Sequence, residues 1–395
     1  MEYIRLKDAI KIKKGKKVQQ AKANESNTIR YIQIDDLRND NEIKYCYQDE
    51  SYIYVDPQDI IIAWDGANAG TIGYGLEGVL GSTLAKLTLT NNKLYAPYVA
   101  LFLQSKFKYF QNTATGATIP HISRKALEDL KIPVFELLIQ KKIYNVLSKI
   151  KTFSEKRQSQ ILALDELTQS VFLEMFGDPK VNKNGYSIES LTNFYENPKD
   201  AVKCGPFGSA LKKDEYVNEG IPVWNMDNIT KQNEFIDCPT LFVTPEKAES
   251  LRSYDVKNGD IIISRAGTVG KMAVIDSEYE SSLISTNLIR LRLSEKLKPE
   301  FLVWLIKIFG DKVCRMRTGN DGSFTHMNTS VLNSIEFPYP PLAKQEEFLK
   351  KLKTLKKEKE KLLESFNEMN ILYNALLQKA FKGELFQEKL NQCIS

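Results

Sequence analysis

The feature that most limits how this chain can fold is an internal repeat, because most of the sequence is written twice. The two histidines of the chain, His121 and His326, stand 205 residues apart in similar segments, GATIPHISRKALEDLKIP and GSFTHMNTSVLNSIEFPYP. The same offset pairs the residues that follow: Leu127 with Leu332, Leu130 with Ile335, Pro133 with Pro338, Leu137 with Leu342, Gln140 with Gln345, Leu147 with Leu352 and Phe176 with Phe381. One offset held over this length indicates two copies of one structural unit.

The repeat extends upstream of the histidines with a looser register. The run from Asp59 to Ile62 matches the run from Asp260 to Ile263, and a glycine turn follows each, GANAG at 66–70 and GTVG at 267–270. Further upstream, residues 31–36 match residues 223–228 at a drifted offset, and the second glycine turn is one residue shorter than the first. Such drift is expected where loops differ in length.

Each copy begins with a globular part that mixes short apolar runs with Gly, Asn and Asp. The four-residue runs 60–63 and 261–264 are typical of buried strands that end in a turn. Residues 98–104 and 300–308 are expected to be helical. This mixture predicts an α+β fold for both globular parts.

Each copy ends with a long helical segment. Residues 139–176 and 342–382 contain no glycine or proline, and Gly177 and Gly383 supply helix stops. Heptad positions from 143 to 175 are apolar in seven of ten cases, and the same positions plus 205 are apolar in nine of ten. We therefore predict two helices of about 40 residues, roughly 60 Å each, with matching apolar seams.

The matching seams predict that the two helices pack on each other, and a pseudo-twofold arrangement of the copies requires them to be antiparallel. Ser154, Arg157 and Lys359 interrupt the seams, so looser packing is expected there. The alternative is that each helix lies on its own domain. The predicted division is a globular domain at 1–136, a helix at 137–180, a second globular domain at 181–341, and a helix with a tail at 342–395.

Composition excludes several classes of protein. The net charge of +5 and the pI of about 8.6 permit nucleic-acid binding without requiring it. Five scattered cysteines without a CxxC pair argue against a disulfide framework or a zinc site. No apolar stretch is long enough to cross a bilayer, and the N-terminus has no signal core, so a cytoplasmic protein is expected.

Catalytic motifs are also missing from the sequence. The sequence has no P-loop, no dinucleotide-binding GxGxxG and no HExxH. The two histidines come with no third metal ligand and no repeated nucleophile–base set. A chain that binds its target without performing chemistry is therefore expected, with no metal and no cofactor of its own.

At this point the sequence resembles the specificity subunits of type I restriction-modification systems. The resemblance covers nearly the whole chain and rests on the repeat together with WDGANAG at 64–70, GATIPHIS at 116–123, LDELTQSVFLEMFGDP at 164–179, GPFGSALKKDEY at 205–216, SRAGTVGK at 264–271 and FPYPPLAKQ at 337–345. It implies two target-recognition domains separated by antiparallel spacer helices. One departure is Thr325, which stands where the first copy has Pro120.

The resemblance also implies partners. Two modification subunits would carry S-adenosylmethionine and methylate adenine, and motor-nuclease restriction subunits would add ATP- and magnesium-dependent cleavage. The target would be double-stranded DNA with two different half-sites and an unread gap. Two alternatives are a stand-alone DNA nuclease or methyltransferase with an unrecognised site, and a coiled-coil scaffold without a DNA role.

Three sets of residues are candidates for DNA contact. Glycine turns let the backbone approach a phosphate or base, and beside them asparagine can read adenine and arginine can read guanine. The candidates at the turns are Trp64, Asn68, Arg265, Thr268 and Lys271. Those around the histidines are His121, Ser123, Arg124, Lys125, His326 and Asn328. Basic clusters add Lys13, Lys14, Lys16, Lys17, Lys203, Lys212, Lys213, Arg315 and Arg317.

Each set also has a structural interpretation. The glycines can serve only to make tight turns. Ser123 and Asn328 can cap the helices that follow them. The histidines can make structural hydrogen bonds, and basic runs can be solvated surface.

Overall fold

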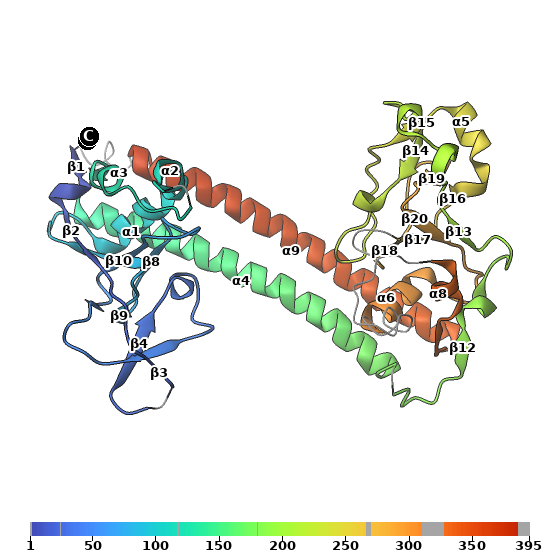
Figure 1. The fold of residues 1–395 in the computed structure, drawn as a ribbon, viewed down its shortest axis with the longest axis horizontal. Helices are drawn as coiled ribbons and strands as arrows, with labels where there is room; N and C mark the ends of the chain where they lie inside the picture. Colours follow the sequence, from blue (N-terminus) through green and yellow to red (C-terminus); the bar gives the residue numbers. More distant parts are fainter. Residues whose placement is uncertain are drawn as a thin grey trace, which may run out of the picture. The chain divides into compact units, whose positions relative to one another are not determined.

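The computed structural model describes residues 2–23, 25–116, 118–179, 181–265, 270–309 and 328–385. They form two compact units: unit 1 is Met1–Ser159 with Leu362–Ser395, and unit 2 is Gln160–Lys361 (Figure 1). Both boundaries fall inside the long helices, α4 (Leu137–Phe176) and α9 (Leu342–Lys382). Each unit therefore contains part of both helices.

The expected α+β fold and the two long helices are confirmed. All ten predicted seam positions of each helix are buried or half-buried. In unit 1, Ile143 and Leu147 near the start of α4 share a core with Ala380 near the end of α9. In unit 2, Phe172 near the end of α4 packs edge-to-face on Phe348 near the start of α9, with ring centroids 5.3 Å apart. The two helices are therefore antiparallel within each unit and pack on each other.

Polar residues in the seams form pairs between the two helices. In unit 1, the Ser154 hydroxyl lies 2.9 Å from the Asn370 amide oxygen and donates to it. In unit 2, Lys359 forms an ion pair with Asp165 at 2.7 Å. Seam positions from 355 to 376 on α9 are half-buried, whereas Ser154 and Ile161 on α4 are buried.

Unit 1 contains a four-stranded antiparallel central sheet and a five-stranded outer sheet. The central sheet has the order β2 (Ile10–Lys14), β10 (Leu84–Leu89), β7 (Ile60–Ala63), β8 (Ile72–Tyr74). The outer sheet has the order β3 (Gln20–Ala21), β5 (Lys44–Tyr47), β4 (Thr28–Ile32), β9 (Gly78–Leu80), β6 (Tyr54–Val55), and β4 and β9 run parallel. A separate pair joins β1 (Glu2–Arg5) and β11 (Lys131–Val134), and the helices are α1 (Ala96–Ser105), α2 (Phe107–Thr113) and α3 (Arg124–Glu128).

Unit 2 repeats this topology, except that its outer sheet has four strands and no counterpart of β3 among the described residues. Its central sheet has the order β13 (Val202–Cys204), β20 (Leu288–Leu291), β17 (Ile261–Ser264), β18 (Met272–Val274). Its outer sheet has the order β15 (Phe242–Val243), β14 (Ile221–Trp224), β19 (Ser282–Ile284), β16 (Asp255–Val256), and β14 and β19 run parallel. The pair β12 (Ile188–Ser190) and β21 (Glu336–Pro338) and the helices α5 (Pro245–Ser250), α6 (Pro299–Phe309) and α8 (Thr329–Asn333) complete it. The twofold correspondence expected from the repeat is therefore present in the topology.

The strands β7 and β17 are buried along their length, and apolar except for Ser264, because both of their faces are covered. Ile60 and Ile62 lie in the core that contains α1 and the helix pair, whereas Ile61 and Ala63 lie in the core beneath the outer sheet. Neighbouring side chains of a strand point to opposite faces, so a strand between two cores has no polar face. The end of this strand is therefore held rigidly where the glycine turn begins.

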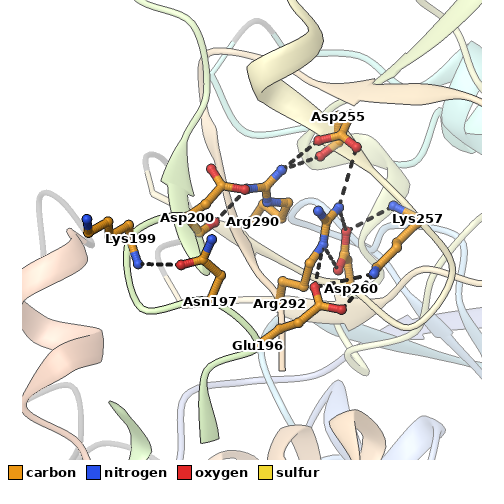
Figure 2. Close-up of polar contacts among 9 residues, drawn as sticks. All are labelled: Glu196, Asn197, Lys199, Asp200, Asp255, Lys257, Asp260, Arg290 and Arg292. Atoms are coloured by element: carbon orange, nitrogen blue, oxygen red, sulfur yellow. Dashed lines mark hydrogen bonds and ion pairs between the residues drawn. The ribbon is translucent and has the colours of Figure 1, made fainter. Parts of the chain in front are cut away.

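A polar network fixes the outer sheet to the central sheet in unit 2 (Figure 2). The side chain of Arg290 is fully buried and donates to the backbone oxygens and the carboxylates of Asp200 and Asp255, at 2.6–2.8 Å. Arg292 forms two hydrogen bonds with the buried Asp260, at 2.8 and 2.7 Å. The hydrogen bond to Asp260 and the neighbouring carboxylates raise the pKa of Arg292 despite its burial.

The same link is simpler in unit 1. Lys86 donates to the backbone oxygen of Tyr54 and to the buried carboxylate of Asp59, at 2.9 and 2.8 Å. Burial opposes ionisation of Asp59, but hydrogen bonds from Lys86 and Thr88 outweigh it and lower the pKa of this carboxyl. A basic side chain at one position of the central sheet therefore connects the two sheets in both units.

Candidate nucleic-acid interface

In unit 1 the glycine turn and the segment around His121 form one continuous surface, although they are far apart in the sequence. The Ile122 amide donates to the Trp64 carbonyl, and the Gly66 amide donates to the Pro120 carbonyl, both at 2.9 Å. His121 also exchanges two backbone hydrogen bonds with Thr115, at 2.7 and 2.9 Å. The predicted candidates Trp64, Asn68 and His121 are therefore brought together.

The glycine turn after β7 requires glycine for both conformation and space. Gly70 has a φ of 95°, and a Cβ added to it would lie 2.8 Å from the Cβ of Phe110 on α2. The neighbouring Gln111 donates from its side chain to the Ala69 carbonyl. Helix α2 therefore supports the turn from beneath, and in unit 1 the glycines make a tight turn.

Trp64 and Asn68 differ in how they use this turn. Trp64 is half-buried and packs against the core of unit 1, so most of its ring serves the fold. Asn68 is half-buried, and its carbonyl accepts from the amide and hydroxyl of Thr71, at 3.1 and 2.8 Å. No hydrogen bond to the Asn68 side-chain amide is found among the described residues. That amide is the more available of the two groups for a base edge.

His121 is held by a carboxylate next to the turn. Its Nδ1 lies 2.6 Å from Oδ1 of Asp65, and Oδ2 of Asp65 forms an ion pair with Lys14 at 2.6 Å. The side chain of Asp65 is 16% exposed, whereas those of His121 and Lys14 are 47% and 49% exposed. We call Lys14, Asp65 and His121 the β2–turn cluster. It links the end of β2 to the turn after β7 and to the loop before α3.

The candidates that follow His121 lie on α3. Ser123 caps this helix by accepting from the Ala126 amide at 3.3 Å, so the capping interpretation is confirmed for Ser123. Arg124 forms an exposed ion pair with Glu128 at 2.7 Å. Lys125 is exposed. Both basic side chains therefore lie at the surface beside His121.

In unit 2, Arg265 occupies the place that Trp64 occupies in unit 1. The Trp64 amide donates to the Thr83 carbonyl at 2.8 Å, and the Arg265 amide donates to the Asn287 carbonyl at 3.0 Å. The guanidinium of Arg265 lies 4.4 Å from the ring centroid of Phe207, which is 56% exposed. Sequence reasoning missed Phe207 as a partner because nothing local links the two residues.

The remaining candidates of unit 2 are spread over several elements. Lys203 on β13 lies over the ring of Tyr254 at 5.5 Å. Lys212 and Lys213 are exposed at the start of a 3-10 helix, and Lys271 is half-buried. Asn328 caps α8 by accepting from the Val331 amide at 3.1 Å, which confirms its capping interpretation. Thr268, Arg315, Arg317 and His326 lie outside the described residues.

Within the described ranges, no group of three His, Cys, Asp or Glu side chains is placed to hold a metal ion. No helix in the described part of the chain has the length and apolar character to span a membrane. The surfaces combine hydrogen-bonding side chains with lysines and arginines, which can contact base edges and phosphates.

Comparison with known proteins identifies the family. The family model described as the type I restriction modification DNA specificity domain matches residues 1–163 and 206–387. The chain is 26% identical over 384 residues to the type I restriction enzyme MjaVIII specificity subunit of Methanocaldococcus jannaschii, covering 91% of this chain and 89% of that protein. It is 20% identical to the EcoBI specificity subunit of Escherichia coli, covering 92% of this chain and 81% of that protein.

Solved structures share the fold. The S subunit of a type I restriction-modification system from M. genitalium matches with a TM-score of 0.59 at 16% identity, and the match covers 96% of each chain. A chain from a structural study of type I complex assembly matches with a TM-score of 0.59 at 17% identity, covering 97% of this chain and 98% of that one. At this level of identity the likeness concerns the architecture alone.

Proposed function

Because this chain belongs to the family of type I restriction-modification DNA specificity subunits, the non-catalytic subunits of these systems, we propose that it reads a bipartite DNA target. Each unit would contact one half-site, chiefly through the major groove, and the base pairs between the half-sites would stay unread. We propose residues 1–136 and 181–341 as the recognition domains, and 137–180 and 342–395 as spacer helices, the second with a tail.

One observation carries this proposal: the same framework presents different side chains in the two units. In the sequence a glycine-bearing segment follows both β7 and β17, and the first residue after the strand is Trp64 in one unit and Arg265 in the other. Arginine can donate two hydrogen bonds to guanine, which tryptophan cannot do. A shared framework with different contact residues suits a target whose two half-sites differ in sequence.

We propose that the full set of candidate residues supplies the DNA contacts. Lysines and arginines would neutralise phosphates, which makes affinity depend on salt, and the residues at the glycine turns would read bases. The Ser123 hydroxyl accepts one hydrogen bond as a cap, whereas the Asn328 amide oxygen accepts two, from the Val331 amide and the Ser330 hydroxyl, so its amide nitrogen is the group that would face DNA. A second hydrogen bond to DNA would remain compatible with capping.

The chemistry would come from partners. Two modification subunits would bind S-adenosylmethionine and flip one adenine of each half-site for methylation. Restriction subunits would supply ATP- and magnesium-dependent cleavage. The specificity chain would position these partners over the DNA and bind no cofactor itself.

The test lengthens the helices and reads the methylated motif. One heptad inserted after Ser154 and one before Asn370 would preserve the seam, because these residues face each other in unit 1. Seven residues add about 10 Å of helix, which corresponds to about three base pairs. We expect the gap in the motif methylated by the reconstituted complex to lengthen by this amount while both half-sites stay the same.

A matched control separates spacing from general damage. Seven residues inserted after the exposed Asn41, in the loop before β5, should change neither the gap nor the half-sites. Altered half-sites with an unchanged gap in the heptad variant would refute the proposed role of the helices. Cleavage or methylation by the purified chain alone would favour a stand-alone enzyme. DNA retention without sequence preference would refute the reading function itself.

A further inference from the structure

We propose that Asp65 is a positioning residue that makes His121 specific for an amino group on a base edge, either N6 of adenine or N4 of cytosine. This inference rests on the proposed DNA-reading function. It concerns the β2–turn cluster of Lys14, Asp65 and His121 in unit 1.

The contacts of Asp65 fix the tautomer of His121. Oδ2 of Asp65 lies 2.6 Å from the ammonium of Lys14, so this carboxylate is paired with a cation. Its Oδ1 lies 2.6 Å from Nδ1 of His121. An ionised carboxylate has no proton to donate, so Nδ1 must carry the proton. In the neutral ring, Nε2 then holds a free lone pair and acts as an acceptor.

The backbone around the cluster holds the ring in one place. The amide of Asp65 donates to the Thr83 carbonyl at 3.1 Å, and His121 is paired with Thr115 by two backbone hydrogen bonds. The next residue, Ile122, is buried and donates to the Trp64 carbonyl. The ring itself is half-exposed, and no partner for Nε2 is found among the described residues. The lone pair is therefore available at a defined position.

In the major groove the bases differ in whether they present a hydrogen-bond donor or an acceptor. Adenine N6 and cytosine N4 are donors, whereas guanine O6, guanine N7 and thymine O4 are acceptors. A neutral ring with its proton on Nδ1 accepts at Nε2, so it pairs with the first group and leaves an unpaired acceptor against the second. Lys14, on the other side of Asp65, stays half-exposed and can contact a phosphate beside the same base.

By sequence, the second copy lacks the lysine and the carboxylate of the β2–turn cluster at the equivalent positions. Strand pairing aligns Lys14 with Cys204, because Lys14 lies opposite Ala85, which pairs with Ile62, and Cys204 lies opposite Ile289, which pairs with Ile263. The sequence repeat aligns Asp65 with Ala266 and retains only the histidine, as His326. By sequence, unit 2 has no carboxylate at this position. A change at Asp65 should therefore alter the preference at one base pair of one half-site and leave the other half-site as an internal control.

The experiment measures DNA retention by the specificity chain in complex with its modification subunits. The duplexes replace each adenine or cytosine of both half-sites, one at a time, by purine or 2-pyrimidinone, which lack the amino group. We expect the unchanged complex to lose about tenfold in affinity at one position through His121, the size of one hydrogen bond. His121→Ala should be insensitive to the missing amino group at that position only.

Asp65→Asn provides the sharper outcome. Lys14 needs an acceptor, so the amide oxygen should stay toward Lys14 and the amide nitrogen should face His121. The ring would then carry its proton on Nε2 and become a donor. We expect the preference at that base pair to reverse from adenine to guanine, or from cytosine to thymine. Glu2→Gln removes an exposed ion pair with Lys93 and should leave all preferences unchanged.

The outcomes distinguish this inference from the proposed function. If the unchanged complex shows no sequence-dependent retention, the reading function fails. If it does, but Asp65→Asn keeps the original preference at every position, the positioning role of Asp65 is refuted. If Asp65→Asn also weakens recognition at the other half-site, its effect is general rather than local, and the inference is again refuted.

Discussion

Replacing Gln140 or Gln345 by leucine would test how the long helices are joined to their domains. Both side chains are fully buried and occupy equivalent positions of the repeat. Oε1 of Gln140 accepts from the Tyr95 amide before α1, and Nε2 donates to the carbonyls of Lys93 and Phe135, at 2.7–2.8 Å. In unit 2, Gln345 accepts from the Lys298 amide before α6 and donates to the Pro340 carbonyl, at 3.0 and 2.9 Å.

The loss of stability depends on how many backbone groups lose their hydrogen-bond partner. Leucine fills a similar volume, so the main cost is the loss of partners for backbone groups. Gln140→Leu leaves one amide and two carbonyls without a hydrogen-bond partner, and Gln345→Leu leaves one amide and one carbonyl without one. At about 1–3 kcal/mol for each group, with some relief from water, we expect losses of about 3–5 kcal/mol in unit 1 and about 2–4 kcal/mol in unit 2.

Hydrogen exchange measured on peptides is the suitable assay, because two units in one chain need not unfold in one step. Exchange should accelerate at least about thirtyfold at the amides before α1 in Gln140→Leu and before α6 in Gln345→Leu, each without an effect on the other unit. Gln169→Leu, on an exposed position of α4, is the control and should change stability by no more than about 0.5 kcal/mol. Equal exchange in all three variants would show that these glutamines are dispensable.

Three further predictions concern the framework. Gly15→Ala and Gly205→Ala should each prevent folding of the unit that contains the substitution. The added Cβ would lie 2.1 Å from a backbone carbonyl oxygen in Gly15→Ala and 2.0 Å from one in Gly205→Ala. Soluble yield and melting temperature would show the loss of folding, and a stable variant would contradict it. Arg290→Met should destabilise unit 2 by about 2–4 kcal/mol, measured by urea unfolding. The loss is limited because the two carboxylates that Arg290 pairs with are half-exposed and can be solvated by water. A loss below about 1 kcal/mol would refute this prediction. Asp59 has a pKa below its ordinary value of 3.8, so its contribution to stability is present above pH 3.8 and is lost as the pH falls below that value. The difference in melting temperature between the unchanged protein and Asp59→Asn should therefore shrink below pH 3.8. A difference that stays constant with pH would contradict this prediction.

Patterns within short stretches of sequence predicted the framework well. The strands expected at 60–63 and 261–264 have those bounds in the structure, and the helices expected from 139 and 342 begin at Leu137 and Leu342. These predictions succeeded because side-chain periodicity reflects burial directly. The alignment of Gln140 with Gln345 also located two buried side chains with the same role.

The contacts that build the candidate surface could not be predicted in this way. Asp65 and His121 are 56 residues apart, and no periodic pattern selects one carboxylate among fifty acidic residues as the partner of a histidine. The parallel pairing of β4 with β9 likewise depends on how the whole unit folds. Phe207 was missed because an exposed aromatic ring next to glycine gives no sign of the arginine that it meets across the sheet.

Because the unit boundaries lie inside the helices, the order of synthesis affects how the chain folds on the ribosome. The core of unit 1 includes Ala380, with Tyr373 and Phe381 packed against it, and all three are synthesised after the last residue of unit 2. At about 5–20 residues per second, the nascent N-terminal domain must wait roughly 10–50 s for the segment that completes it. The part of the protein that is made first is therefore the last to close, and its apolar surface is the one that chaperones would have to shield during translation.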